Sequence, residues 1–346
     1  MAAALGLRGL PRCAALGPGI QRGRRCFSLL AQLPDFAAGE QALKEGRYAD
    51  ALPMLQRSVE VADAYFPPDA GAERAQCHKA LGSCLWHQGH FDEAARAWTL
   101  SDGALHLAAA RAHFELGNFE QVAKLTSDAA VLGAVCAVRG EEVPEVQGPL
   151  AVIAQVNRLV KEAVIGAEGA SDVPEPTAAS LLEAEASAEL RLLLRCTLGE
   201  LAVLAGQKDD WVRECLVKCL KDYDALEPKD PVQQAVVVRS LTALATLTNA
   251  RGDAITAEGL FRSAQDQARA KLPTGGSGGS GGSGRRRLWA RQVPEAFARM
   301  LETGRHAEQR APEIRDLRAE AAQLSPGEAT ASERRWGLVV LPQVEE

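Results

Sequence analysis

The sequence predicts an all-α protein, in which helical hairpins would pack into an irregular solenoid that carries a flexibly linked C-terminal helical tail. Three observations favour this fold class. Of the 346 residues, 47% are apolar but only 5% are aromatic, a balance that suits packed helices better than an aromatic-rich β-sandwich. Apolar residues recur at helical spacing, and glycines recur where paired helices would turn back. No stretch approaches 18 uninterrupted apolar residues, so no transmembrane segment is expected.

The first 27 residues have the composition of a mitochondrial presequence. They contain five arginines, no acidic residue and no lysine. Pro11 and the Gly17–Gly19 stretch interrupt the apolar core that a secretory signal needs. The stretch Arg25–Ser28 resembles a matrix-peptidase site, which places the expected cleavage after Phe27. We therefore expect a mitochondrial protein of the matrix; the alternative is a basic N-terminus on a cytosolic protein.

The charge balance argues against a nucleic-acid partner. The whole chain has 39 basic and 45 acidic residues, and without residues 1–27 the count becomes 34 basic against 45 acidic, a net charge of −11. Binding to phosphates requires a basic surface, which this balance does not favour. A protein partner is therefore expected, and a helical-repeat protein of mitochondrial RNA or ribosome metabolism is the alternative.

The clearest motif has a fixed spacing of glycine, aromatic and small residues, which runs through Leu81, Gly82, Gly89, Phe91, Ala94, Trp98 and Ser101. Gly82 would let the two helices of a hairpin approach closely, and Gly89 would end the first helix in a left-handed conformation. Phe91 and Trp98 would then fill the space between the helices.

The same spacing recurs around Gly46, Gly117 and Gly252, with a weaker start at Gly206. The pattern resembles the tetratricopeptide (TPR) repeat, a helix–turn–helix unit of roughly 34 residues. The 43-residue interval between the first two turn glycines is similar to the longer repeat subtype of kinesin light chains. The next interval, of 28 residues, predicts truncated helices and an irregular superhelix.

These signals divide the chain into six segments. They are a presequence (1–27), an N-terminal TPR array (32–136), a connecting helix and loop (137–189), a second TPR-like array (190–271), a Gly/Ser linker (272–287) and a C-terminal helical tail (288–346). Outside the first array, helices are expected at Pro149–Ile165, Thr177–Ala205, Asp210–Leu226, Leu288–Leu301 and Arg305–Leu324, with Pro294 and Pro312 interrupting the last two.

The tail contains three distinct features. The linker sequence GGSGGSGGSG predicts a solvated coil spanning roughly 16–19 Å, either engineered or produced by codon slippage. Arg285–Arg287 is the tail's basic run, with nucleic-acid or lipid contact as the alternative to a plain charged run. The apolar patch Trp336–Leu341 is expected to dock on the array as a cap, and the alternative is partner binding.

No motif points to an enzyme, a cofactor or a metal. The phosphate loop, the dinucleotide-binding glycine pattern and the serine nucleophile elbow are missing from the sequence. The cysteines beyond the presequence are expected to be buried, reduced side chains. The alternatives are a metal or redox pair at Cys215 and Cys219, which share a helix face, and a zinc site built from His87, His90 and a carboxylate.

The resemblance to TPR proteins implies a protein partner bound in a concave groove lined by the first helix of each hairpin. The residues predicted to line that groove are Lys79, Ser83, Trp86, His87, Arg111 and Phe114. Aromatic rings beside cations would hold an apolar peptide with an acidic group. In the alternative, Trp86 and Phe114 pack against the neighbouring hairpin. The expected function is a mitochondrial scaffold or adaptor that acts in the assembly or maturation of a complex.

Overall fold

The protein is all-helical in the computed structural model, as the sequence predicts. The structure describes residues 29–67, 70–101, 105–143, 147–165, 173, 175–183, 187–227, 230–271, 284–324 and 336–341, and these residues form helices and no strands. The predicted presequence and the Gly/Ser repeat up to residue 283 lie outside the described residues. None of the described helices is both long enough and apolar enough to cross a membrane.

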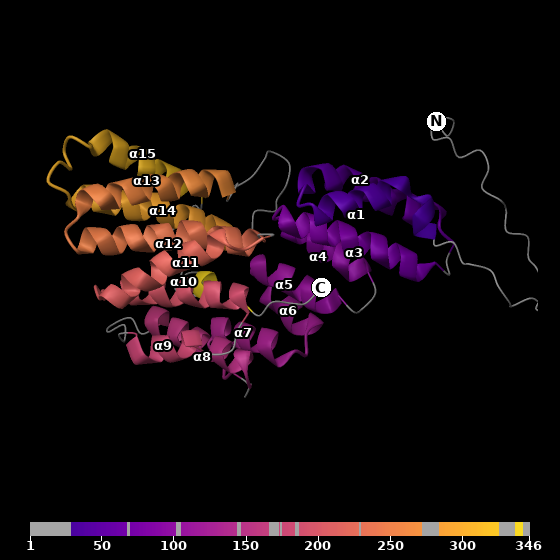
Figure 1. Ribbon diagram of the computed structural model, residues 1–346, viewed down its shortest axis with the longest axis horizontal. Helices are drawn as coiled ribbons and strands as arrows, with labels where there is room; N and C mark the ends of the chain where they lie inside the picture. Colours follow the sequence, from indigo (N-terminus) through magenta and orange to yellow (C-terminus); the bar gives the residue numbers. More distant parts are fainter. Residues whose placement is uncertain are drawn as a thin grey trace, which may run out of the picture.

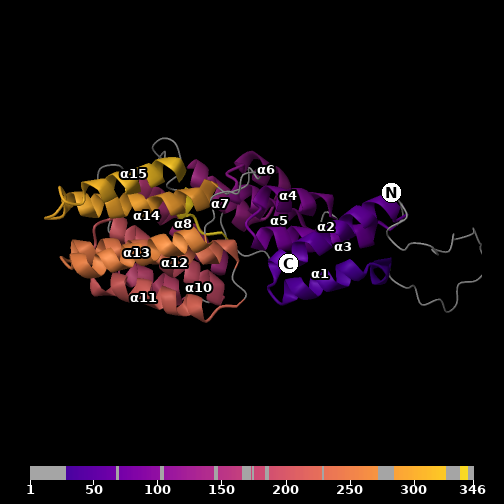
Figure 2. The ribbon, with the colours of Figure 1, turned by 90° about the horizontal axis from the view of Figure 1, so that it is seen from above.

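The helices pack in consecutive pairs along an elongated body (Figures 1 and 2). The first part contains η1 (Leu29–Gln32), α1 (Pro34–Lys44), α2 (Tyr48–Tyr65), α3 (Gly71–His87), α4 (Phe91–Leu100), α5 (His106–Glu115), α6 (Phe119–Leu125) and α7 (Ala129–Arg139). The rest contains α8 (Pro149–Ile165), α9 (Glu175–Glu183), α10 (Ala188–Leu204), α11 (Asp210–Asp224), α12 (Pro231–Ala250), α13 (Ala254–Lys271), α14 (Gly284–Thr303) and α15 (Ala311–Leu324). Helices α1–α4 form one end, α10–α15 form the other, and α5 and α6 lie between them.

Five of these pairs are joined by the same turn. Each has a glycine with a φ between 72° and 94°, namely Gly46, Gly89, Gly117, Gly206 and Gly252. The residue after the glycine donates its N–H to a carbonyl five positions back, as in the 2.9 Å bond from His90 to Leu85. This bond satisfies one of the carbonyl groups left open at the end of the helix. The positive φ of the turn residue favours glycine, because glycine has no Cβ. The turn positions predicted from the glycine spacing are therefore confirmed.

Close approach within the pairs also depends on glycine. A Cβ added at Gly82 would lie 2.6 Å from the ring of Trp98, and one added at Gly199 would lie 2.6 Å from the side chain of Leu216. The predicted role of Gly82 is thus confirmed. The motif positions of the second helix are buried as expected, including Phe91, Ala94, Trp98 and Ser101.

The predicted helix boundaries are partly correct. The helix Pro149–Ile165 is found as expected, as α8. The single long helix expected over 177–205 is wrong, because α9 and α10 occupy this range as two helices. Helix α10 has its own N-cap at Ser187, whose hydroxyl accepts a hydrogen bond from the N–H of Leu190 at 3.2 Å. Helix α14 continues through Pro294, where an interruption was expected.

The C-terminal helices belong to the main body. Helix α14 packs on α12 and α13 and pairs with α15. The ring of Phe297 stacks on Phe261 at 5.3 Å, and Arg310 forms an ion pair with Glu258 at 3.0 Å. The tail predicted to be flexibly linked is therefore packed on α12 and α13. Residues 284–287, the last part of the predicted linker, form the first turn of α14.

Candidate functional site

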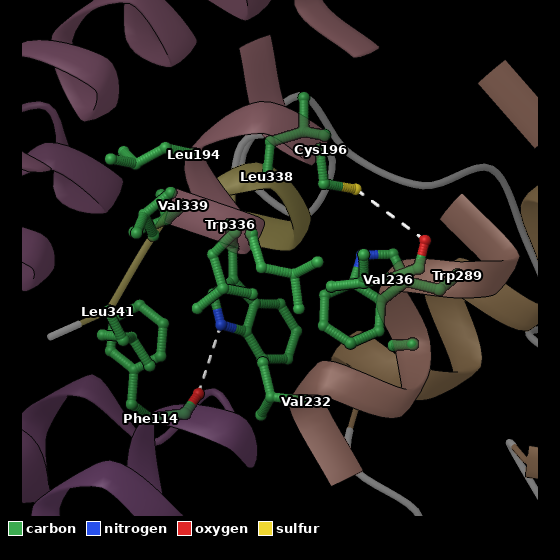
Figure 3. Packing of buried hydrophobic residues seen from close by; sticks show 14 of the residues in the cluster. Phe114, Leu194, Cys196, Val232, Val236, Trp289, Trp336, Leu338, Val339 and Leu341 are labelled. Atoms are coloured by element: carbon green, nitrogen blue, oxygen red, sulfur yellow. Dashed lines mark hydrogen bonds between the residues drawn. The ribbon is translucent and has the colours of Figure 1, made fainter. Parts of the chain in front are cut away.

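A short stretch of chain after α15 lies buried at the junction between the two ends of the body. This C-terminal segment, Trp336–Leu341, forms one helical turn and then runs without regular structure. Its side chains are almost fully enclosed, with 7% of Trp336 and 1% of Val339 exposed. Figure 3 shows it among residues of α5, α10, α12 and α14. The apolar patch therefore docks on the helices, as expected, but it lies at this junction and not at an end of the body as a cap.

Trp336 anchors the segment to the turn between α5 and α6. Its indole N–H donates a hydrogen bond to the carbonyl oxygen of Phe114 at 3.2 Å (Figure 3). The ring meets Phe119 edge-on, with 5.8 Å between ring centroids. A Cβ added at Gly117 would lie 3.3 Å from the indole, so the turn glycine leaves room for the ring. The left-handed turn of this hairpin thus has a second role, because it receives the segment's largest side chain.

Side chains of three further helices bind the main chain of the segment. Asn157 of α8 makes two bonds to Val340, donating to its carbonyl at 3.1 Å and accepting from its N–H at 2.9 Å. The indole N–H of Trp289 donates to the carbonyl oxygen of Gly337 at 2.9 Å. The guanidinium of Arg285 donates to the carbonyl oxygen of Val339 at 3.1 Å, and the hydroxyl of Thr197 donates to that of Leu338 at 3.4 Å. Buried main-chain groups need such partners. We call the residues that make these contacts, Phe114, Gly117, Asn157, Thr197, Arg285 and Trp289, the docking site.

A buried ion pair supports the docking site. Arg285 Nη1 lies 3.1 Å from Glu115 Oε1, and the two side chains are 2% and 0% exposed. Burial raises the pKa of Glu115 and lowers the pKa of Arg285 to about 10, because removal from water disfavours the charged form of each group. Arg285 therefore keeps its proton at neutral pH. Glu115 Oε2 and Arg285 Nε make no hydrogen bond within the described chain.

A second buried pair joins α10 to α12 beside the same segment. Arg239 Nε donates to Glu200 Oε2 at 2.9 Å, and its Nη2 donates to the Thr197 hydroxyl at 3.1 Å. Two guanidinium groups lie near the ring of Trp289. The distance from the guanidinium carbon to the ring centroid is 5.1 Å for Arg239 and 5.0 Å for Arg285. Such cation–π contacts are strongest where water is excluded. The docking site is therefore apolar in its side-chain contacts and strongly polar toward the bound main chain.

The six residues predicted to line a concave groove do not form an exposed wall. These residues are Lys79, Ser83, Trp86, His87, Arg111 and Phe114. Trp86, Phe114 and Ser83 are buried, and Trp86 packs edge-on against Phe91 at 4.6 Å. The exposure predicted for the two aromatic rings is therefore corrected. Trp86 packs on α4 and Phe114 packs on α6, so the ring contacts of each lie within its own hairpin. The next hairpin reaches Trp86 through the guanidinium of Arg111, which lies 4.6 Å from the ring centroid. The physical reason is that short hairpins bring α4, α5 and α6 close enough to cover these rings.

The polar members of the predicted set are also engaged within the fold. The ring of His87 stacks on Tyr48 with 4.6 Å between centroids. Arg111 forms an ion pair with Asp230 at 3.0 Å, which joins α5 to the start of α12, and Lys79 is half-buried. Of the six residues, Phe114 belongs to the docking site, because its carbonyl accepts the hydrogen bond from the indole of Trp336.

The sequence interpretation missed most of the docking site. Asn157 is 1% exposed on a helix whose predicted core stripe includes Val156 and Val160. A polar residue next to such a stripe is a signal, since a buried amide must find partners. Its partner is Val340, which lies 183 positions away in the sequence. No local pattern could have connected the two.

The cysteines of the described chain are free and buried. No group of three or more His, Cys, Asp or Glu side chains suited to a metal ion is found among the described residues. The thiol of Cys215 donates a hydrogen bond to the carbonyl oxygen of Arg195 at 3.4 Å. The sulfur atoms of Cys196 and Cys219 each lie 3.5 Å from the hydroxyl oxygen of Ser240.

The thiols of Cys77, Cys84 and Cys215 are expected to react slowly in the folded protein. Burial raises the pKa of Cys77 and Cys84 to about 11 and that of Cys215 to about 12, from an ordinary value of 9.0. At pH 8 the thiolate fraction at Cys77 and Cys84 then falls about 100-fold, so alkylation by iodoacetamide should slow by at least that factor relative to the denatured chain. Mass spectrometry of alkylated peptides measures the rates. Labelling of these residues at the denatured rate would show that the core is open in solution.

Comparison with family models gives no match to this chain, and comparisons with curated proteins and with solved structures give none either.

Proposed function

We propose that the chain is a TPR-type scaffold or adaptor of the mitochondrial matrix that binds a protein partner during assembly or maturation of a mitochondrial complex. The observation that carries this proposal is the repeated hairpin unit. Five helix pairs share one turn geometry, and the pairs pack side by side. Arrays of this kind offer extended helical surfaces to partners.

Two features support a protein rather than a nucleic acid as the partner. Arg285 and Arg286, two members of the tail's basic run, are only 2% and 5% exposed. They are therefore not available to phosphates, and the remaining chain is acidic overall. The mitochondrial address rests on the arginine-rich, acid-free composition of residues 1–27.

The test is purification of the full chain, with an epitope tag after residue 346, from crosslinked mitochondria, followed by quantitative mass spectrometry. We expect the subunits of one complex to be enriched at least about tenfold over a control variant. That control has Arg8, Arg12, Arg22, Arg24 and Arg25 replaced by glutamine, which removes the positive charge of the presequence.

The control variant should stay in the cytosol and lose the partner. Recovery of RNA and ribosomal proteins that is lost at high salt would favour the alternative function in RNA or ribosome metabolism. A wild-type chain that remains cytosolic would contradict the proposed address.

A further inference from the structure

We propose that the docking site is a peptide-binding site of this scaffold, occupied in the present structure by the chain's own C-terminal segment. The ligand that the site fits is a partner segment with an aromatic ring followed by branched aliphatic residues, in a main chain that makes one helical turn and then continues without regular structure. This inference rests on the proposed function, and it names the surface that would bind the partner and the chemistry that the surface would select.

The first support is the way in which the segment is held. Five hydrogen bonds reach its main chain from Asn157, Thr197, Arg285 and Trp289, which lie on three different helices. Main-chain groups are the same in every polypeptide, so these donors and the Asn157 acceptor would bind any segment of similar backbone shape.

The second support is the way in which side chains are selected. The indole of Trp336 fits over Gly117 and against Phe119, so one end of the site takes a flat aromatic ring with an N–H donor. The remainder encloses Leu338 and Val339 in apolar surroundings (Figure 3). A partner segment with a charged side chain in place of Val339 would leave that charge buried without a partner, which excludes it.

The third support is the place of the segment in the chain. Helix α15 ends at Leu324, and eleven residues separate it from Trp336. The segment follows α15, so its departure from the docking site requires none of the helices α1–α15 to unwind. Attachment to the same chain gives it an effective concentration of roughly millimolar, so a free peptide of micromolar affinity cannot compete with it. Weakening the segment should therefore make the site available.

The experiment measures peptide binding to the purified full chain by fluorescence anisotropy. The probe is a labelled synthetic peptide that covers residues 334–343 of this sequence. In the test variant, Val340→Pro removes the N–H that donates to Asn157. We expect the peptide to bind this variant at least tenfold more tightly than it binds the wild-type chain. Adding Asn157→Ala to the variant should weaken the peptide about tenfold, and a scrambled peptide should not bind.

Hydrogen exchange on the wild-type chain gives a second readout, which holds even if the proline variant does not fold. If the segment can leave, the amide of Val340 should exchange at least tenfold faster than the amides in the middle of α12. Equal exchange rates at Val340 and in α12, or a folded Val340→Pro variant that does not bind the peptide, would overturn the proposal. Both measurements use purified protein, so failure to find a mitochondrial partner would count against the proposed function and not against the docking site.

Discussion

Replacing Trp336 with alanine is expected to lower the free energy of unfolding by about 3–5 kcal/mol, the usual loss when a buried tryptophan is truncated. The indole is enclosed between Phe119 and the α5–α6 turn, and its N–H satisfies the carbonyl of Phe114. Alanine would leave a cavity, and the carbonyl of Phe114 would keep only its 2.9 Å bond from the N–H of Gly117. Chemical denaturation followed by circular dichroism measures the change.

A matched control is Leu204→Ala, since 64% of that side chain is exposed at the end of α10 and its loss should change stability by no more than about 0.5 kcal/mol.

The combination of Trp336→Ala with Leu338→Ala should destabilise the protein by less than the sum of the two single effects. The reason is that both side chains belong to one segment, which can detach from the rest of the fold. Once the segment detaches, a further substitution in it causes no additional loss of stability. A loss below about 1 kcal/mol for Trp336→Ala would mean that the indole is not enclosed in solution.

Removing one member of the Glu115–Arg285 pair is expected to have a similarly large effect. Glu115→Ala leaves the guanidinium of Arg285 buried without its carboxylate, and Arg285→Met leaves the Glu115 carboxylate without its cation. Loss of one partner of a buried pair typically lowers the free energy of unfolding by about 3–5 kcal/mol. Replacing both partners together, as Glu115→Gln with Arg285→Met, should restore much of that loss.

The pH dependence provides a further check on the pair. Burial already raises the folded-state pKa of Glu115 above its ordinary 4.5, and loss of Arg285 would raise this pKa further. A carboxyl group with a raised folded-state pKa stabilises the fold at low pH and loses this contribution as the pH rises through that pKa. The deficit of Arg285→Met relative to wild type should therefore shrink as the pH is lowered toward 4.5.

The matched control for this pair is Glu120→Ala, which removes the exposed ion pair with Lys124 on α6 and should change stability by about 0.5 kcal/mol or less. Equal losses at Glu115 and Glu120 would contradict the burial of the first pair. Denaturation curves recorded at several pH values measure all of these variants.

Much of the fold could be predicted because its signals are local. The glycine spacing located five helix turns, and the small residue at Gly82 indicated the close approach to Trp98. The stop between α9 and α10 was missed because a serine N-cap inside an apolar helical pattern is a weak signal beside the pattern itself. The passage of α14 through Pro294 was missed because packing on α12 and α13 overrides local preference.

The predicted interaction surface shows the limit of such inference. Trp86 and Phe114 were placed on the correct helices, but helical periodicity does not say whether a neighbouring element will cover a face. The same limit explains the arginine run at the start of α14. Its sequence is that of a solvated charged stretch, yet Arg285 is buried, because Glu115 lies where it can neutralise the charge.

The amino-acid sequence by itself determined the helical class, the hairpin turns and the core positions within each hairpin, because these depend on residues fewer than about 35 positions apart. Only the tertiary structure decided how the hairpins close around Trp336–Leu341. The contacts of that segment join Asn157 to Val340 and Phe114 to Trp336, 183 and 222 positions apart. Pairings at such separations arise from the shape and charge of the assembled surfaces, and no local pattern in the chain encodes them.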